Sequence, residues 1–241
     1  MIKLLQGDCL ELMKGIKDKS IDMILCDLPY GTTHNKWDTV ISLDAMWKQY
    51  NRIIKDNGVI CLFSQMPFSA MLVSSNLQMY RYEWIWKKSN STGFLNANKM
   101  PLKTHESINV FYKKLPTYNP QFTQGKPYKA TTGSQTANYN EFYKVTTVSD
   151  GRRYPIDVLE FNSEMGLHPT QKPVALLEYL IKTYTNEGET VLDNCMGSGS
   201  SGVASIHTNR NFIGIELDKD YFEIAKKRID AEQKEMTLWV R

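Results

Sequence analysis

Four residues near the start of the chain combine groups that could bind a planar, amino-bearing ring. Asp27-Leu28-Pro29-Tyr30 directly follows the apolar run 21–26, which has the length and composition of a strand buried on both faces. A carboxylate, a proline-stiffened turn and an aromatic ring at the end of such a strand can contact a ring at its edge and its face. The motif therefore marks a candidate site for chemistry on an amino group.

A second candidate site lies in the last quarter of the chain. The strand-like run 190–193 is followed by a loop containing Gly197 and Gly199, and then by a helix start. Glycines allow a ligand to approach the backbone, and N–H groups at a helix start attract carboxylate or phosphate. Glu216 ends the next strand, where a ribose diol is usually held. The pattern predicts a nucleotide-type site. With Gly202 in third place, the glycines also have the GxGxxG spacing of dinucleotide-binding enzymes, so such an enzyme is one alternative. A turn without a ligand is the other, simpler alternative.

The elements that must position these motifs alternate between strands and helices. Apolar runs and periodicity predict strands at 2–5, 21–26, 59–63, 80–87, 107–112, 190–193 and 212–216, with helices between most of them. This alternation predicts an α/β fold with a mostly parallel sheet, whose ligands bind beyond the carboxyl ends of the strands. Periodicity fades over 115–164, but this stretch contains several tyrosines, so we expect an irregular inserted lobe rather than disorder.

The net charge of +3 is distributed unevenly along the chain. Residues 87–155 hold eleven Lys and Arg and three acidic residues, so the remainder is net negative. This segment is expected to face an anion, although a solvated lysine-rich surface gives the same pattern. There is no long apolar stretch, no signal peptide and no CxxC pair. We therefore expect a soluble cytoplasmic protein with free thiols, no bound metal and no membrane partner.

Together these motifs resemble those of S-adenosylmethionine-dependent DNA amino-methyltransferases, whose catalytic motif is [DNS]-P-P-[YFW]. The resemblance spans essentially the whole chain and rests on five motifs in a fixed order, namely Gly7-Asp8, DLPY, HPTQKP, DNCMGSGS and IGIELD. With DLPY first, the basic lobe second and the glycine loop last, the order is similar to that of the beta group, a circular permutation of the methyltransferase fold. Leu28 stands where the family usually has proline. The family uses the backbone carbonyl at this position, and Leu28 can still supply it.

This resemblance implies the fold and the domain organisation. The fold is expected to be Rossmann-like, with a mostly parallel seven-stranded sheet in circularly permuted order. Residues 1–114 would form the catalytic part and residues 165–241 the cofactor-binding part of one domain. Residues 115–164 would be an inserted target-recognition lobe between them.

The resemblance also implies roles for the catalytic motif Asp27, Leu28, Pro29 and Tyr30. The Asp27 carboxylate and the Leu28 carbonyl would accept hydrogen bonds from the target amino group, freeing its lone pair to attack the sulfonium methyl. Tyr30 would stack on the base, which must first be flipped out of the duplex. Catalysis would come from positioning and electrostatics, without a covalent intermediate.

The implied cofactor is S-adenosylmethionine, with S-adenosylhomocysteine as product. Glu216 would bind the ribose hydroxyls, Asp8 would lie near the adenine amino group, and Lys172 would approach the methionine carboxylate. The full expected set is Asp8, Cys9, Asp27, Lys172, Asp193, Cys195, Met196, Gly197, Ser198, Gly199, Ser200, Glu216 and Leu217.

The implied substrate is duplex DNA, methylated at adenine N6. Asp27 favours adenine over cytosine N4, for which the family more often has serine at that position. An RNA amino-methyltransferase and a non-catalytic DNA-binding protein are the further alternatives. The expected partners also include a second copy of the chain and a cognate restriction endonuclease. The expected DNA-binding residues are Lys87, Lys88, Lys126, Lys129, Arg152 and Arg153.

Overall fold

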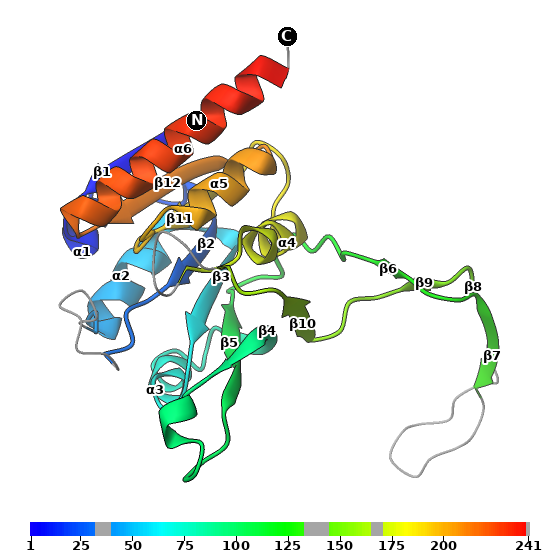
Figure 1. Cartoon of the computed structure of the whole chain (residues 1–241). Helices are drawn as coiled ribbons and strands as arrows, with labels where there is room; N and C mark the ends of the chain where they lie inside the picture. The colour runs from blue at the N-terminus through cyan, green and yellow to red at the C-terminus, as the bar shows by residue number, and fades with distance from the viewer. Residues whose placement is uncertain (32–39, 133–144, 165–170, 240–241) are drawn as a thin grey trace. The chain divides into compact units, whose positions relative to one another are not determined.

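A computed structural model describes residues 1–31, 40–132, 145–164 and 171–239 of the chain (Figure 1). An eight-stranded sheet forms the centre of the larger of two compact units. Its strands lie in the order β1 (Ile2–Gln6), β12 (Asn211–Glu216), β11 (Thr190–Asp193), β2 (Ile21–Asp27), β3 (Ile54–Ser64), β5 (Lys103–Phe111), β4 (Tyr80–Thr92) and β10 (Val158–Phe161).

The sheet is mixed but mostly parallel. The first five strands, from β1 to β3, are parallel, β5 is antiparallel to both its neighbours, and β10 is parallel to β4. This arrangement agrees with the predicted α/β class. The expected number of seven strands is wrong, because Val158–Phe161 pairs with β4 as an eighth strand. Only Leu159 of this short strand is buried, so its sequence carries little strand signal.

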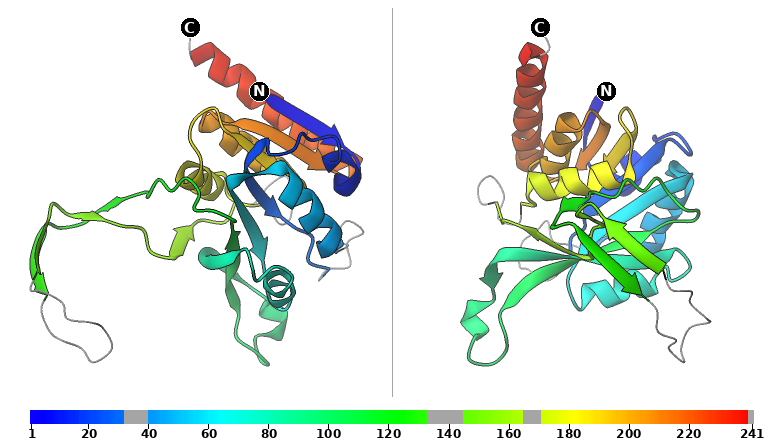
Figure 2. Two further views of the ribbon diagram at one scale, coloured as in Figure 1. Left: turned by 180° about the vertical axis from the view of Figure 1, so that it is seen from behind. Right: turned by 90° about the vertical axis from the view of Figure 1, so that its right-hand side faces the viewer.

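Helices cover both faces of the sheet (Figures 1 and 2). The first core cluster contains buried residues of α4 (Val174–Tyr184), α5 (Ser200–His207) and α6 (Lys219–Trp239). The second contains those of α1 (Cys9–Met13), α2 (Leu43–Ile53) and α3 (Phe68–Ser74). In α2, Met46, Trp47, Tyr50 and Ile53 recur at helical spacing and are buried, so one apolar stripe fixes this helix on the sheet.

The smaller compact unit comprises Pro120–Ile156, and the larger comprises Met1–Asn119 and Asp157–Arg241. The smaller unit contains two short antiparallel ribbons. In one, β6 (Thr123–Gln124) pairs with β9 (Arg152–Arg153). In the other, β7 (Tyr128–Thr132) pairs with β8 (Val145–Ser149). This unit lies inside the lobe expected at 115–164, whose last part instead forms β10 of the main sheet.

The carboxyl ends of the five parallel strands meet at one edge of the sheet. The loops after β2, β11 and β12 therefore lie together there, although these strands are far apart in the sequence. Among the described residues, no helix is long and apolar enough to cross a membrane.

Candidate active site

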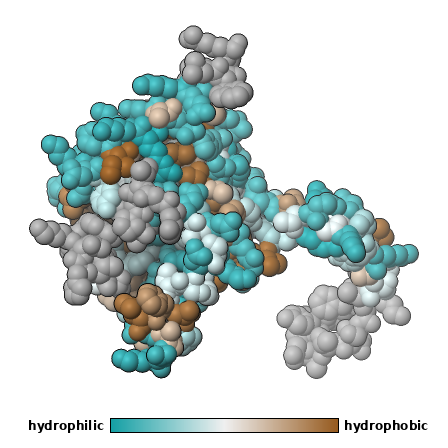
Figure 3. All heavy atoms as spheres, viewed as in Figure 1, coloured by the Kyte–Doolittle hydropathy of each residue, from teal (hydrophilic) through white to brown (hydrophobic). Residues whose placement is uncertain are grey.

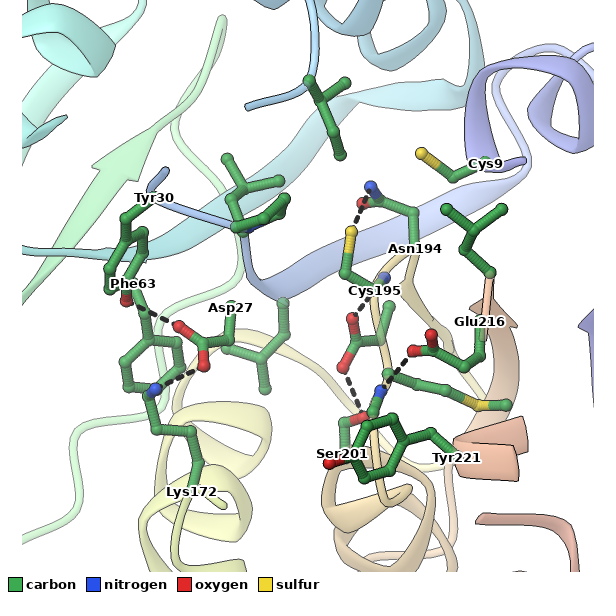
Figure 4. Close-up of a pocket in the computed structure, with 18 of the residues that line it drawn as sticks. Cys9, Asp27, Tyr30, Phe63, Lys172, Asn194, Cys195, Ser201, Glu216 and Tyr221 are labelled. Atoms are coloured by element: carbon green, nitrogen blue, oxygen red, sulfur yellow. Dashed lines mark hydrogen bonds and ion pairs between the residues drawn. The ribbon is translucent and has the colours of Figure 1, made fainter. Parts of the chain in front are cut away.

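A cavity of about 470 Å³ opens at this edge of the sheet, within the size range of small-molecule sites. Residues from all five motifs line it. The HPTQKP motif contributes Gln171 and Lys172, and its first three residues, 168–170, lie outside the described residues. Figure 4 shows Asp27, Tyr30, Phe63 and Lys172 at one end, with Glu216 and Tyr221 at the other. The cavity thus has two chemically different ends.

Glu216 closes the glycine-loop end of the cavity. Its Oε2 accepts a hydrogen bond of 2.8 Å from the Gly197 backbone N–H, and its Oε1 accepts one of 2.8 Å from that of Asp218. Burial raises the pKa of the Glu216 carboxyl, partly opposed by these two hydrogen bonds. Each carboxylate oxygen can accept a further bond, so Glu216 can still bind two hydroxyl groups of a ligand.

Asp193 organises the loop that follows β11. Its Oδ2 accepts a hydrogen bond of 2.6 Å from the Ser201 hydroxyl, and its Oδ1 accepts one of 3.0 Å from the Cys195 backbone N–H. Burial raises the pKa of Asp193 to about 6. Both of its oxygens are used within the loop, so Asp193 shapes this end of the cavity.

Gly199 does not line the cavity, in contrast to its expected cofactor contact. Its φ of +79° lies in the left-handed region, and a Cβ atom there would come within 3.0 Å of the Ala225 and Ile229 side chains. Gly199 is needed for the turn into α5 and for close packing against α6. Gly197, with a φ of +51°, has open space where its Cβ would be and does line the cavity.

Asp8 lies at the start of α1. Its Oδ1 accepts hydrogen bonds from the backbone N–H groups of Leu10 at 2.8 Å and Glu11 at 3.2 Å, so it caps the helix. The other carboxylate oxygen has no hydrogen bond described within the protein, and Asp8 lines the cavity. The remaining expected cofactor residues that line it are Cys9, Cys195, Met196, Ser198, Ser200 and Leu217.

The thiols of Cys9 and Cys195 are half-buried, and those of Cys26 and Cys61 are buried. All four are free. Burial raises the pKa of Cys26 to about 12, so this thiol stays protonated at neutral pH. Among the described residues, no cluster of His, Cys, Asp or Glu could hold a metal ion.

Asp27 lines the end of the cavity away from Glu216. Its Oδ1 accepts a hydrogen bond of 2.6 Å from the Tyr30 hydroxyl, and its Oδ2 forms an ion pair with the Lys172 ammonium (Figure 4). The Tyr30 ring packs against Phe68 with 5.4 Å between centroids. Leu28 and Pro29 also line this end. The four residues of the catalytic motif therefore meet at one place, as expected from their spacing.

Lys172 lies between the half-buried carboxylate of Asp27 and the buried carboxylate of Glu106. Besides Asp27, it contacts Glu106 Oε2 at 3.3 Å, and Glu106 forms a second ion pair with Lys88. Burial lowers the pKa of Lys172, but the charges of Asp27 and Glu106 outweigh it and hold that pKa above its ordinary value. Lys172 therefore remains an ammonium group. It lies at the Asp27 end, away from Glu216 (Figure 4), whereas a contact with the methionine carboxylate was expected.

The expected DNA-binding residues have different surroundings. Lys88 is 13% exposed and its ammonium forms an ion pair with Glu106, so a phosphate would have to compete with Glu106 for it. Lys87 is exposed but forms an ion pair of 2.8 Å with Glu160. In the small unit, Lys126 and Lys129 are exposed.

Arg152 and Arg153 are neighbours with different contacts. The Arg152 guanidinium lies 4.7 Å from the ring centre of Phe122 and the side chain is exposed. Arg153 donates to the Lys126 carbonyl at 2.6 Å and to the Ser149 hydroxyl at 3.1 Å, and it lies over the Tyr128 ring. Arg152 is thus free to bind an anion, while Arg153 is largely used to hold the small unit together.

Several residues of the site were not identified from the sequence. Glu106 lies 4% exposed in β5, and the only available signal was a single carboxylate ahead of an apolar run. Gln65 follows β3 and donates a hydrogen bond of 3.2 Å to Glu106. Tyr221 is on α6, beside Glu216 (Figure 4). Ser201 of α5 also lines the cavity, as do Phe63, which sequence alone leaves open between core and pocket wall, and Gln171 of the HPTQKP motif.

The arrangement can bind a charged, elongated ligand and an aromatic base together. Glu216, Gly197 and the uncommitted oxygen of Asp8 suit a nucleoside, while Asp27, Tyr30 and the Leu28 carbonyl suit an amino-bearing ring. A family model described as DNA methylase (N6_N4_Mtase) matches residues 21–227 of the chain.

Curated relatives align over nearly the whole chain. The type II methyltransferase M.HpaI of Haemophilus parainfluenzae is 30% identical over 95% of this chain and 74% of its own length. The DNA adenine methyltransferase YhdJ of Escherichia coli (strain K12) is 28% identical over 95% of this chain and 82% of its own length.

Solved structures give the same result for the fold. The M1.HpyAVI–SAM complex has a TM-score of 0.65 at 26% identity, covering 95% of this chain and all of that one. The cytosine-N4-specific PvuII DNA methyltransferase has a TM-score of 0.71 at 15% identity, and the match covers 94% of this chain and 86% of that one. Because the family model matches well over half of the residues, including the Asp27 motif and the Glu216 strand, this chain belongs to the DNA methylase family.

Proposed function

We propose that this protein transfers a methyl group from S-adenosylmethionine to adenine N6 of a base flipped out of duplex DNA. The observation that carries the proposal is the Asp27 end of the cavity, where a carboxylate, a backbone carbonyl and two aromatic rings converge. Membership of the DNA methylase family defines the substrate class. The adenine specificity named for the relative YhdJ, together with aspartate rather than serine at position 27, favours adenine.

The glycine-loop end fits S-adenosylmethionine, which supplies an electrophilic methyl group when bound. Glu216 has acceptor sites left for the ribose hydroxyls, and Gly197 leaves open space where a side chain would stand. Asp8 has a free carboxylate oxygen for an amino group. The relative M1.HpyAVI was solved as a SAM complex. We assign the loop 194–201, Asp8 and Glu216 to cofactor binding.

The chain's own part in the reaction is to orient the target amino group. Its nitrogen is a poor nucleophile while its lone pair is delocalised into the ring. Hydrogen bonds to the Asp27 carboxylate and the Leu28 carbonyl draw it toward tetrahedral geometry, and Tyr30 stacks on the base. Lys172 stays protonated, so it cannot accept a hydrogen bond from the target amino group. The Asp27 carboxylate and the Leu28 carbonyl are the acceptors that we assign to that group.

We further propose that the small unit and its exposed cations Lys126, Lys129 and Arg152 contribute to target recognition. The DLPY motif precedes the glycine loop in the chain, which supports the circularly permuted order. Relatives named type II methyltransferases support a cognate restriction endonuclease as partner. We also propose that the protein forms a homodimer and is located in the cytoplasm.

Nucleoside analysis of DNA after incubation with the protein and labelled S-adenosylmethionine tests this function. We expect labelled N6-methyladenine, and at least a tenfold lower turnover for Asp27→Ala, with cofactor affinity within a few-fold of wild type. Labelled N4-methylcytosine would contradict the adenine assignment, and label only in RNA would contradict DNA as substrate. An Asp27→Ala variant that keeps a tenth or more of the turnover would remove Asp27 from its role.

A further inference from the structure

The end of β4, the short helix η1 (Phe94–Asn96) and the start of β5 form a hairpin that projects from the sheet (Figure 1). Every residue from 89 to 105 is exposed. Its tip carries four large apolar side chains in contact with solvent, Phe94 at 75%, Leu95 at 86%, Met100 at 54% and Leu102 at 42% exposure. Figure 3 shows these apolar atoms together at the bottom of the view. Such a cluster marks an interaction site, because folding does not bury it.

The charge of the hairpin identifies the partner. Residues 87–105 contain four lysines and no carboxylate. Two of the lysines, Lys99 and Lys103, are exposed and enter none of the ion pairs described for the chain. A surface that is cationic and apolar fits a polyanion that also offers flat apolar faces for stacking. Duplex DNA has both properties.

The hairpin lies at the same edge of the sheet as the cavity. β5 is antiparallel to both β3 and β4, so β4 runs in the direction of β3 and ends where the cavity opens. Glu106 of β5 lines the cavity, and Lys103 lies roughly 10 Å further out along the strand. A duplex that delivers a base to Asp27 must cover this edge, and it therefore meets the hairpin.

We propose that Phe94 and Leu95 enter the duplex beside the target nucleotide and stack where the flipped base has left the helix. The inference rests on the proposed function, since it presupposes a flipped base. Extrusion of a paired base sacrifices stacking and pairing, and an inserted apolar side chain replaces part of that stacking. Lys99 and Lys103 bind the phosphates on either side of the opening.

The test compares two duplexes that carry the recognition sequence, first determined by sequencing DNA methylated by the wild-type protein. In one duplex the target base is paired normally, and in the other it lies opposite an abasic site, which removes the pairing cost. The variant is Phe94→Ala/Leu95→Ala. The control is Leu77→Ala, which removes a side chain that is 67% exposed. Leu77 precedes β4 and is therefore at the opposite edge of the sheet.

We expect the tip variant to lose about tenfold or more in kcat/KM on the paired duplex and less than about threefold on the abasic duplex. The control variant should stay within about twofold of wild type on both. An equal loss of kcat/KM on both duplexes, or no loss on either, would overturn the proposal that Phe94 and Leu95 enter the duplex. A change of molar mass in light scattering for the tip variant alone would assign the tip to a contact between copies instead. Wild-type protein that methylates neither duplex would contradict the proposed function itself.

Discussion

Lys172 and Asp27 are 145 residues apart in the chain and form an ion pair at the reactive end of the cavity. The Tyr30 hydroxyl donates to the other oxygen of the same carboxylate. Asp27 is thus held in one orientation by two donors before any base arrives. A carboxylate has about four lone-pair sites, so it retains acceptor capacity for a target amino group. The ion pair therefore supplies preorganisation without blocking the site.

Lys172→Met should lower methyl transfer strongly and also destabilise the fold. Removing the ammonium leaves Asp27 without its cation, while Glu106 keeps its ion pair with Lys88. Because the Asp27 side chain is 25% exposed, the cost should be about 1–3 kcal/mol, less than for a fully buried charge. We expect a loss of that size in the free energy of unfolding from urea denaturation, and a fall in kcat of tenfold or more at temperatures where the variant remains folded.

Lys172→Arg is the matched control, because it keeps the charge. It should recover most of the stability and part of the turnover. If Lys172→Met were as stable and as active as wild type, the ion pair with Asp27 would have no role in positioning. If both variants lost stability equally but kept kcat, Lys172 would serve the fold alone.

Glu216→Ala should weaken binding of S-adenosylmethionine. Two ribose hydroxyls would lose a charged acceptor worth about 1.5–3 kcal/mol, which corresponds to roughly a tenfold to hundredfold higher Kd. Isothermal titration calorimetry measures this directly, with Asp27→Ala as the comparison whose affinity should change little. An unchanged Kd for Glu216→Ala would mean that the ribose is held by other groups.

The neighbours Arg152 and Arg153 should differ when each is replaced by alanine. Arg152 is exposed and its guanidinium lies over the Phe122 ring, so Arg152→Ala should lower the slope of log affinity against log salt by about 0.9, the value for one phosphate contact. Arg153→Ala removes two hydrogen bonds within the small unit and should increase proteolysis between residues 120 and 156. Equal salt slopes for Arg152→Ala and wild type would place Arg152 away from the phosphates.

The strands that carry the chemistry could be predicted from the sequence because they are buried on both faces. Five of the seven residues 21–27 are apolar, and the DLPY motif at their end lines the cavity. The elements that were misjudged depend on tertiary pairing. The strand predicted at 59–63 already begins at Ile54 in the structure, because Ile54 pairs with Ile21 across the sheet.

The contacts between distant charges could not be predicted in the same way. Lys88 and Lys172 look like free cations in the sequence, but each forms an ion pair with Glu106. Nothing in the local pattern shows that a residue of β5 lies beneath the loop before α4. Likewise, both Gly197 and Gly199 have a positive φ, and only the close packing of Gly199 against α6 distinguishes it from Gly197.

His207 should make stability depend on pH. Its Nδ1 and Nε2 lie 2.7 Å from the carboxylates of Glu178 on α4 and Glu232 on α6, and Lys182 also pairs with Glu178. Burial lowers the pKa of His207, but its hydrogen bonds to Glu232 and Glu178 outweigh this and raise the pKa above 6.5. The folded state thus binds the proton more tightly than the unfolded chain does. The stabilisation is complete below pH 6.5 and is lost as pH rises through the folded-state pKa.

His207→Gln removes the titrating group but keeps one polar side chain at the position. The difference in unfolding free energy between wild type and His207→Gln, measured by urea denaturation from pH 5.5 to 9, should favour wild type at low pH. It should shrink as pH rises, by up to about 1 kcal/mol, the range of partly exposed ion pairs. Added salt should reduce this difference at low pH, because it screens charges that are partly exposed. A difference that stays constant across this range would show that His207 does not bind its proton more tightly in the folded state.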